Sequence, residues 1–195
     1  GGYSRHGPSD CSMVPLTKAL AAWQTVSGVA PEDAEDIRIC GGVSTDGGKT
    51  RSFVNKLDAK LGTLTNCKRL SLSTNCIDKL LPFSGMTSLQ ILSLGRNVIK
   101  RIEKLDDLAG TLEQLWMSYN QVSSLDGVLP LVNLQVLYLA HNQIKDWSEV
   151  DKLASLPALK EIILIGNPLY EGMDEATARA NVVKRIPHIV KVDTV

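Results

Sequence analysis

Five segments of the chain repeat one pattern of apolar positions and a single asparagine, L-x-x-L-x-L-x-x-N-x-L. The copies begin at Cys67, Leu89, Leu112, Leu134 and Leu159, and 22 to 25 residues separate one asparagine from the next. Within each copy two apolar residues alternate with outward ones, and this period of two predicts a short β-strand. The predicted inward pairs are Leu70 and Leu72, Leu92 and Leu94, Leu115 and Met117, Leu137 and Leu139, and Ile162 and Leu164.

After each asparagine the apolar residues recur at about every third position, as in Ile99, Ile102, Leu105 and Leu108. This period predicts a 3₁₀ or short helical return to the next strand. A unit of about 22 residues cannot bury its own apolar face, so the units stack and their strands pair in parallel. We therefore predict an α/β fold: a leucine-rich-repeat solenoid of about six repeats, with a curved parallel β-sheet and helical caps at both ends.

The repeated asparagine has a structural explanation. Its side-chain amide can donate to and accept from the backbone groups that the turn after each strand would otherwise bury without a partner. The alternative, a surface turn residue, does not explain why the asparagines keep step with the inward leucines. We predict a ladder made of Asn75, Asn97, Asn120, Asn142 and Asn167.

The flanking segments predict caps and one domain. Apolar residues at helical spacing, Leu16, Ala19, Leu20, Trp23 and Val26, predict an N-terminal helical cap over 15–28. Residues 37–39 look like a degenerate first strand, and 176–185 like a helix followed by a covering segment at 186–193. The predicted organisation is a flexible tail over 1–14 and one domain over 15–195, with repeats over 37–170, an insertion at 41–52 and a C-terminal cap over 171–195.

Charge and composition argue against several functional classes. Twenty-one basic residues balance 21 acidic ones, so no overall field favours nucleic acid. No apolar run reaches the length of a membrane span, and the start of the chain is interpreted as a tail rather than a signal peptide. We expect a monomer without nucleic-acid or membrane partners. The cysteines lack metal or disulfide-cluster spacing, which predicts reduced thiols in a cytosolic compartment: Cys11, Cys40, Cys67 and Cys76.

The sequence shows no catalytic or metal-binding constellation. His6, His141 and His188 lie in the tail, a mid-repeat turn and the terminal cap, and no spacing joins them. The segment 47–50, Gly-Gly-Lys-Thr, is similar to the end of a phosphate-binding loop, but that pattern requires glycine where the chain has Val43. We predict no cofactor, no metal and no enzymatic activity. A nucleotide-binding enzyme is the alternative from another class, and ATP or GTP would then raise its melting temperature.

The outward strand positions are the candidate binding site, because a solvent-facing side chain there is expected to be polar unless something covers it. Adjacent aromatic residues on neighbouring strands are typical of interface anchors. The alternative is that the C-terminal segment covers them. The predicted partner-binding residues are Ile91, Arg96, Trp116, Tyr119, Val136, Tyr138, His141 and Ile163.

Six motifs resemble the leucine-rich-repeat light-chain family of axonemal outer-arm dynein: LSLSTNCI, ILSLGRNVIKRIE, LEQLWMSYNQV, LQVLYLAHNQI, LIGNPLY and VVKRIPHI. The resemblance runs from about Pro15 to Asp193, while 41–52 looks like an insertion relative to the family. It implies a non-enzymatic subunit of a ciliary or flagellar outer dynein arm, located in the cytoplasm, cytoskeleton and axoneme.

The resemblance also implies that this subunit binds a dynein heavy chain at its microtubule-binding stalk tip through the face that carries Trp116 and Tyr138. It would modulate the interaction between motor and microtubule, with tubulin as a further partner. The repeats are similar to those of protein-phosphatase regulators as well, and such a regulator is the alternative function. A spliceosomal leucine-rich protein is disfavoured by the neutral charge.

Overall fold

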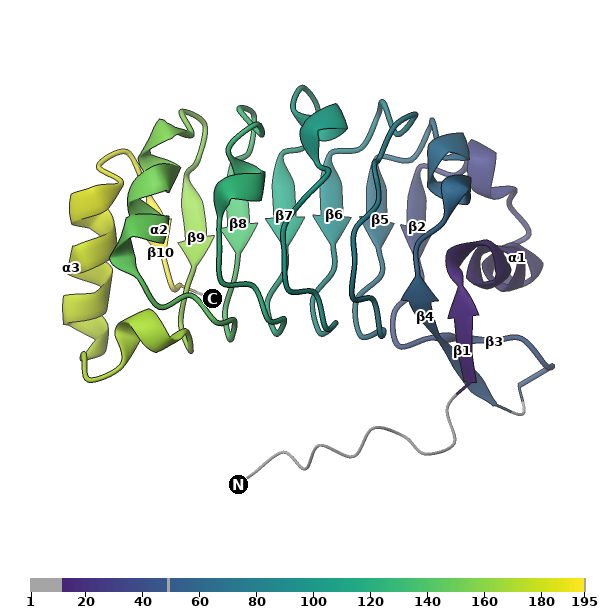
Figure 1. The fold of residues 1–195 in the computed structure, drawn as a ribbon. Helices are drawn as coiled ribbons and strands as arrows, with labels where there is room; N and C mark the ends of the chain where they lie inside the picture. The colour runs from purple at the N-terminus through teal and green to yellow at the C-terminus, as the bar shows by residue number, and fades with distance from the viewer. Residues whose placement is uncertain (1–11, 49, 195) are drawn as a thin grey trace.

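The computed structural model describes residues 12–48 and 50–194. Its main feature is a parallel sheet of seven strands in the order β10-β9-β8-β7-β6-β5-β2, which confirms the predicted leucine-rich-repeat fold. Figure 1 shows these strands side by side in one row, with α1 near one end and α3 at the other. The strands are β2 (Asp36–Arg38), β5 (Arg69–Ser71), β6 (Ile91–Ser93), β7 (Gln114–Trp116), β8 (Val136–Tyr138), β9 (Glu161–Ile163) and β10 (Lys191–Val192).

The inward side chains of these strands form the core. All the residues predicted to point inward, from Leu70 to Leu164, are fully buried. The apolar residues at three-residue spacing after each strand are buried as well, because they pack on the opposite side of the same core. The returns between strands are short and mostly 3₁₀ helices: η3 (Asp106–Leu108), η4 (Asp126–Val128), α2 (Trp147–Lys152), η5 (Leu153–Ser155) and η6 (Pro168–Tyr170).

Each repeat asparagine connects two neighbouring repeats through its side-chain amide. The Nδ2 of Asn120 donates to the carbonyl oxygens of Leu94 and Met117, each at 3.0 Å, and its Oδ1 accepts from the Ile99 N–H at 3.0 Å. Donation to two neighbouring repeats recurs at the other four positions: Asn75, Asn97, Asn142 and Asn167. Asn97, Asn142 and Asn167 also accept from the preceding return, whereas Asn75 accepts from the Val54 N–H of the strand at 51–56. The turn after each strand therefore buries these backbone groups with their hydrogen bonds made.

A second, three-stranded sheet lies at the N-terminal end of the solenoid. Its central strand β4 (Arg51–Lys56) pairs in parallel with β1 (Ser12–Pro15) and antiparallel with β3 (Val43–Ser44). Two predictions need correction here. Residues 12–14 form a strand instead of a flexible tail, because they pair with residues 52–54 of β4. The segment 41–52 is not a plain loop insertion, because it supplies β3 and the start of β4, which pair with each other. Residues 1–11 lie outside the described part of the chain.

The N-terminal helix α1 (Leu16–Ser27) covers the first strands. It buries Leu16, Ala19 and Leu20, while Trp23 is half-buried against the core. Val26 was predicted on the buried face and is 88% exposed, because the last turn of the helix extends beyond the core. Gly28 then ends the helix in the left-handed conformation.

One carboxylate fixes the start of α1 to the following return. Asp58 accepts hydrogen bonds from the Thr17 N–H at 2.9 Å and from the Lys60 N–H at 3.0 Å. It thereby serves the first turn of α1 and the start of η2 (Ala59–Thr63) at the same time. The short helix η1 (Pro31–Asp33) lies between α1 and β2.

The C-terminal segment covers the last repeat. Helix α3 (Glu175–Arg185) is capped at its N-terminus by Asp174, whose side chain accepts from the Thr177 N–H at 2.7 Å. Strand β10 pairs with β9. Buried Asp193 accepts from the Leu164 N–H at 2.6 Å and from the Tyr170 hydroxyl at 2.7 Å. These bonds close the end of the solenoid. No helix in the described ranges has the length and apolar character that a membrane span requires.

Candidate functional site

The outward face of the sheet brings the predicted patch residues into two rows. Parallel pairing places equivalent residues of successive strands directly beside one another. Most of these side chains are half-buried by their neighbours and remain accessible from the solvent side. One row holds Ser93, Trp116, Tyr138 and Ile163, and the other holds Ile91, Gln114, Val136 and Glu161.

The two aromatic residues at the centre of this face stack on each other. The ring centroids of Trp116 and Tyr138 lie 5.7 Å apart with an interplanar angle of 21°. The Tyr138 hydroxyl donates to Glu161 Oε1 at 2.5 Å, and the Lys191 ammonium lies 3.2 Å from Glu161 Oε2. Four side chains from four adjacent strands therefore hold one another in place, so this part of the face is ordered before any partner arrives.

These contacts shift the pKa values of Tyr138 and Glu161 in opposite directions. Burial and the hydrogen bond to the Glu161 carboxylate raise the pKa of Tyr138 to about 12. The bond from the Tyr138 hydroxyl, assisted by the Lys191 charge, lowers the pKa of Glu161. At neutral pH the tyrosine is a neutral donor and the glutamate an ionised acceptor, which is the strong arrangement for this hydrogen bond.

A second stack borders the patch along the turns that follow the strands. The Arg96 guanidinium lies 4.4 Å from the centroid of the Tyr119 ring, and that ring lies 4.4 Å from the His141 ring at an angle of 18°. All three residues have positive φ, between 53° and 61°, and each directly precedes a ladder asparagine. Gly166 holds the equivalent place in the next repeat, where a β-carbon would come within 2.4 Å of His141 Nδ1. The missing side chain makes room for the imidazole.

The structure thus gathers the eight predicted partner-binding residues into one central patch and one adjoining stack. Trp116 also carries a buried Nε1 donor without a hydrogen-bond partner in the described part of the chain. Such a donor is costly, about 1 to 3 kcal/mol, when it stays unpaired. Its place on the outward face, rather than in the core, associates that cost with the candidate binding surface.

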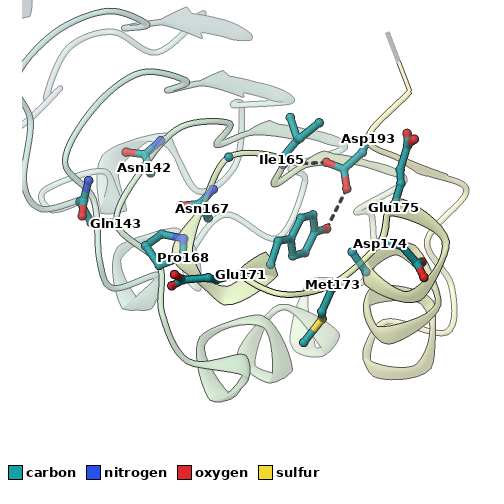
Figure 2. A pocket seen from close by; sticks show the side chains of 13 residues that line it. Asn142, Gln143, Ile165, Asn167, Pro168, Glu171, Met173, Asp174, Glu175 and Asp193 are labelled. Atoms are coloured by element: carbon teal, nitrogen blue, oxygen red, sulfur yellow. Dashed lines mark hydrogen bonds between the residues drawn. The ribbon is translucent and has the colours of Figure 1, made fainter. Parts of the chain in front are cut away.

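A cavity of about 540 Å³ opens between the last repeat and α3. Figure 2 shows its lining residues, with Met173, Asp174 and Glu175 on the α3 side and the bonds from the Tyr170 hydroxyl and Ile165 backbone to Asp193 at its inner wall. Burial and the Asp193 carboxylate raise the pKa of Tyr170 well above its usual range. These groups satisfy one another, which is typical of a structural cap.

Polar groups of the glycine-rich loop form hydrogen bonds within the loop itself. The Gly48 N–H donates to Ser44 Oγ at 2.6 Å, and the Thr50 N–H donates to Asp46 Oδ1 at 3.0 Å. A phosphate cradle instead needs backbone N–H groups directed at the ligand and no carboxylate among them. This arrangement does not fit a nucleotide phosphate. Lys49, the lysine of the Gly-Gly-Lys-Thr segment, lies outside the described residues.

The histidines and cysteines lie apart. His141 belongs to the aromatic stack, and His188 Nε2 lies 2.9 Å from the Leu156 carbonyl oxygen. Cys67 is buried, which raises the pKa of its thiol to about 11. His6 and Cys11 fall outside the described residues. Within 12–48 and 50–194, no three histidine, cysteine, aspartate or glutamate side chains are placed to hold a metal ion.

Comparisons with known proteins first define the class. The family model for leucine-rich repeats in two copies matches residues 111–152 and 132–172. Among solved structures, internalin C2 of Listeria monocytogenes superposes with a TM-score of 0.58 at 21% identity, covering 90% of this chain and 91% of the internalin. A leucine-rich-repeat protein of Leptospira interrogans gives 0.62 at 22% identity, covering 82% of this chain and 37% of its own. At this identity the two structures support the fold alone.

Sequence relatives then define the family. The chain is 46% identical over 182 residues to the dynein axonemal light chain 1 of Chlamydomonas reinhardtii, covering 91% of this chain and 88% of the relative. It is 40% identical over 185 residues to the human protein of the same name, covering 91% and 90%. The chain belongs to the axonemal dynein light chain 1 family.

The contacts that link Tyr138, Glu161 and Lys191 were not predicted from the sequence. Glu161 occupies an outward position, but its bond to Tyr138 runs diagonally between the neighbouring strands β8 and β9. A signal existed: Glu161 is the acidic residue in its row, next to an outward tyrosine. No such signal pointed to Lys191, because β10 does not carry the repeat pattern.

Proposed function

We propose that this chain is a non-catalytic light chain of a ciliary or flagellar outer-arm dynein and is located in the axoneme. In this proposal its outward sheet face binds a dynein heavy chain at the microtubule-binding stalk tip and modulates the grip of the motor on the microtubule. The names of its relatives support the class of complex. The observation that carries the assignment to this face is the stacked pair of Trp116 and Tyr138 on the solvent side of the sheet.

The size of the patch supports a protein partner. Two fully exposed aromatic side chains could bury on the order of 300 to 500 Å² of surface, worth at most roughly 7 to 12 kcal/mol at about 25 cal/mol per Å². Trp116 and Tyr138 are already half-buried and stacked on each other, so the gain on binding is smaller than this. Association costs of about 4 to 15 kcal/mol offset much of this gain. A partner must therefore also cover the aliphatic residues around the rings, which are Ile91, Val136 and Ile163. A protein surface can do this, and a small ligand cannot.

Tubulin is the second partner in this proposal, reached when the light chain is bound at the stalk tip. Cosedimentation with microtubules, with and without the heavy-chain stalk tip, separates direct contact from contact through the heavy chain. A phosphatase regulator would use a face of the same kind. The relatives favour dynein between these two.

A matched pair of valines tests the binding face. Val136 lies in the patch, whereas Val132 is 50% exposed in the loop that precedes β8. Calorimetric titration with the purified stalk tip of an outer-arm heavy chain should show binding by the wild type. We expect Val136→Ala to weaken it about three- to tenfold, as two lost methyl groups imply, and Val132→Ala to leave it unchanged. Equal affinities for all three proteins would place the partner on another surface.

A further inference from the structure

A groove of about 780 Å³ follows the edge of the solenoid where β6, β7 and β8 end. Figure 1 shows the turns after these strands along one edge of the sheet, apart from the outward face itself. Three successive repeats contribute residues just after their ladder asparagines. The lining is Val98, Lys100 and Arg101 from the first repeat, Gln121 and Ser123 from the second, and Gln143 from the third.

The groove is lined by hydrogen-bond donors and positive charge. Val98, Gln121 and Gln143 occupy the same repeat position, one residue after the asparagine, so the two amides lie in line across neighbouring repeats. Lys100 and Ser123 share the next accessible position. No carboxylate belongs to the lining. The surface therefore presents two cations, two amides and one hydroxyl toward the same space.

The two cations have no acidic partner within the described chain. Other cationic side chains of the chain form ion pairs, such as Lys152 with Asp126 at 2.6 Å and Arg185 with Asp151 at 3.2 Å. Lys100 and Arg101 are exposed, and within 12–48 and 50–194 they form neither an ion pair nor a hydrogen bond. Their charges remain available to a ligand.

We propose that this groove binds a short acidic segment of a partner protein in extended conformation. Strands of neighbouring repeats lie about 4.8 Å apart, so three repeats span about 10 Å, which matches three extended residues at about 3.3 Å each. Carboxylates of the segment pair with Lys100 and Arg101, and the guanidinium can do so through two parallel hydrogen bonds. The amides of Gln121 and Gln143 then donate to main-chain carbonyl oxygens of the same segment.

A peptide fits these observations better than a nucleic acid does. Nucleic-acid surfaces carry a basic stripe on a basic domain, whereas this chain is neutral overall and the groove has two cations. None of the eight predicted partner-binding residues lines the groove. The acidic segment therefore uses residues other than those proposed to bind the heavy chain.

The test uses a fluorescein-labelled hexaglutamate peptide and the full chain, with fluorescence anisotropy as the readout. We expect wild-type binding that weakens as salt is raised from 50 to 300 mM, because exposed charges are screened. The variant Lys100→Glu/Arg101→Glu should lose at least tenfold in affinity. The matched control Lys18→Glu/Lys56→Glu changes the net charge equally at exposed positions on α1 and β4 and should stay within twofold of wild type. Circular dichroism checks that each variant is folded. If Lys100→Glu/Arg101→Glu does not fold, Lys100→Gln/Arg101→Gln takes its place.

Three results would overturn the proposal. The first is no measurable binding by the wild type at low salt. The second is an equal loss in the control variant, which would mean that net charge alone attracts the peptide. The third is equal or tighter binding of a single-stranded hexanucleotide. Retained peptide binding by Trp116→Ala/Tyr138→Ala, by contrast, supports a separate site and is independent of the heavy-chain proposal.

Discussion

Gly127 lies so close to Ile102 that a β-carbon on Gly127 would fall 1.8 Å from the Ile102 carbonyl oxygen. The two residues belong to the returns of neighbouring repeats, so this contact sets how tightly those returns stack. Gly127 does not have a positive φ, and the glycine is required by space rather than by backbone conformation. The inward leucines fix the spacing on the strand side, and this contact fixes it on the opposite side.

Substitution of that glycine should destabilise the fold. In Gly127→Ala the methyl group meets a backbone carbonyl, so the two returns must separate, and we expect a loss of at least about 2 kcal/mol in the free energy of unfolding. Gly110→Ala is the control, because a β-carbon there has no atom within 4 Å and should change stability by less than about 0.5 kcal/mol. Urea denaturation of both variants measures the two losses in the free energy of unfolding. Equal stabilities would mean that the returns can separate without cost.

The asparagine ladder makes a second stability prediction. Asn120→Ala leaves the Ile99 N–H without its side-chain partner. It also removes one of two side-chain donors from each of the Leu94 and Met117 carbonyl oxygens, which keep the donors of the neighbouring ladder asparagines. We expect a loss of about 1 to 3 kcal/mol, because the unpaired Ile99 N–H is buried. Asn133 is exposed and donates one bond, to the Gly110 carbonyl oxygen, so Asn133→Ala should cost less than about 1 kcal/mol. A smaller loss at Asn120 than at Asn133, by thermal melting, would contradict the ladder.

The bond between Tyr138 and Glu161 predicts a dependence of stability on pH. Because the folded pKa of Glu161 lies below its unfolded value of about 4.3, its contribution is complete above that value and is lost as pH falls through the folded pKa. The stability difference between wild type and Glu161→Gln, measured by urea denaturation, should therefore shrink between pH 6 and pH 3. The effect is small, under about 1 kcal/mol, since the pair is near the surface. A difference independent of pH would show that the charge of Glu161 contributes nothing.

The sequence predicts the repeats well, because each repeat restates the same physical requirement. The inward leucines at a spacing of two and the asparagine at a fixed offset recur five times, so strand, core side and turn follow from alignment alone. The outward positions of Trp116 and Tyr138 follow from the same alternation. Whether those positions bind a partner does not follow, because a pattern places a side chain without naming what covers it.

The N-terminal sheet was not predictable in this way. Strands β1 and β4 pair over a separation of about 40 residues and have no repeat to align them, so the sequence contains nothing that specifies their register. The glycine-rich segment also lacks a clear strand pattern, yet β3 forms because β4 offers it an edge. The contact at Gly127 was missed for a related reason, since a glycine in a return is compatible with a loose turn as well as with a close approach.

The last prediction concerns the central aromatic pair. Trp116→Ala/Tyr138→Ala removes two half-buried rings and leaves the inward core of Leu115 and Leu137 intact, so we expect a loss of stability of about 1 to 2 kcal/mol from the lost stacking and packing. Binding of the heavy-chain stalk tip should weaken at least tenfold, because the rings form the centre of the proposed interface.

Trp147→Ala is the matched control for this variant. Trp147 is also half-buried and stacked, on Tyr170 with centroids 5.9 Å apart, and Arg185 lies over its ring at 4.5 Å, but it lies on the return side of the solenoid. Its removal should cost similar stability in urea denaturation and leave calorimetric affinity for the stalk tip unchanged. If both variants lost stability and neither lost affinity, the Trp116 and Tyr138 rings would serve the fold alone, and the heavy chain would have to bind elsewhere.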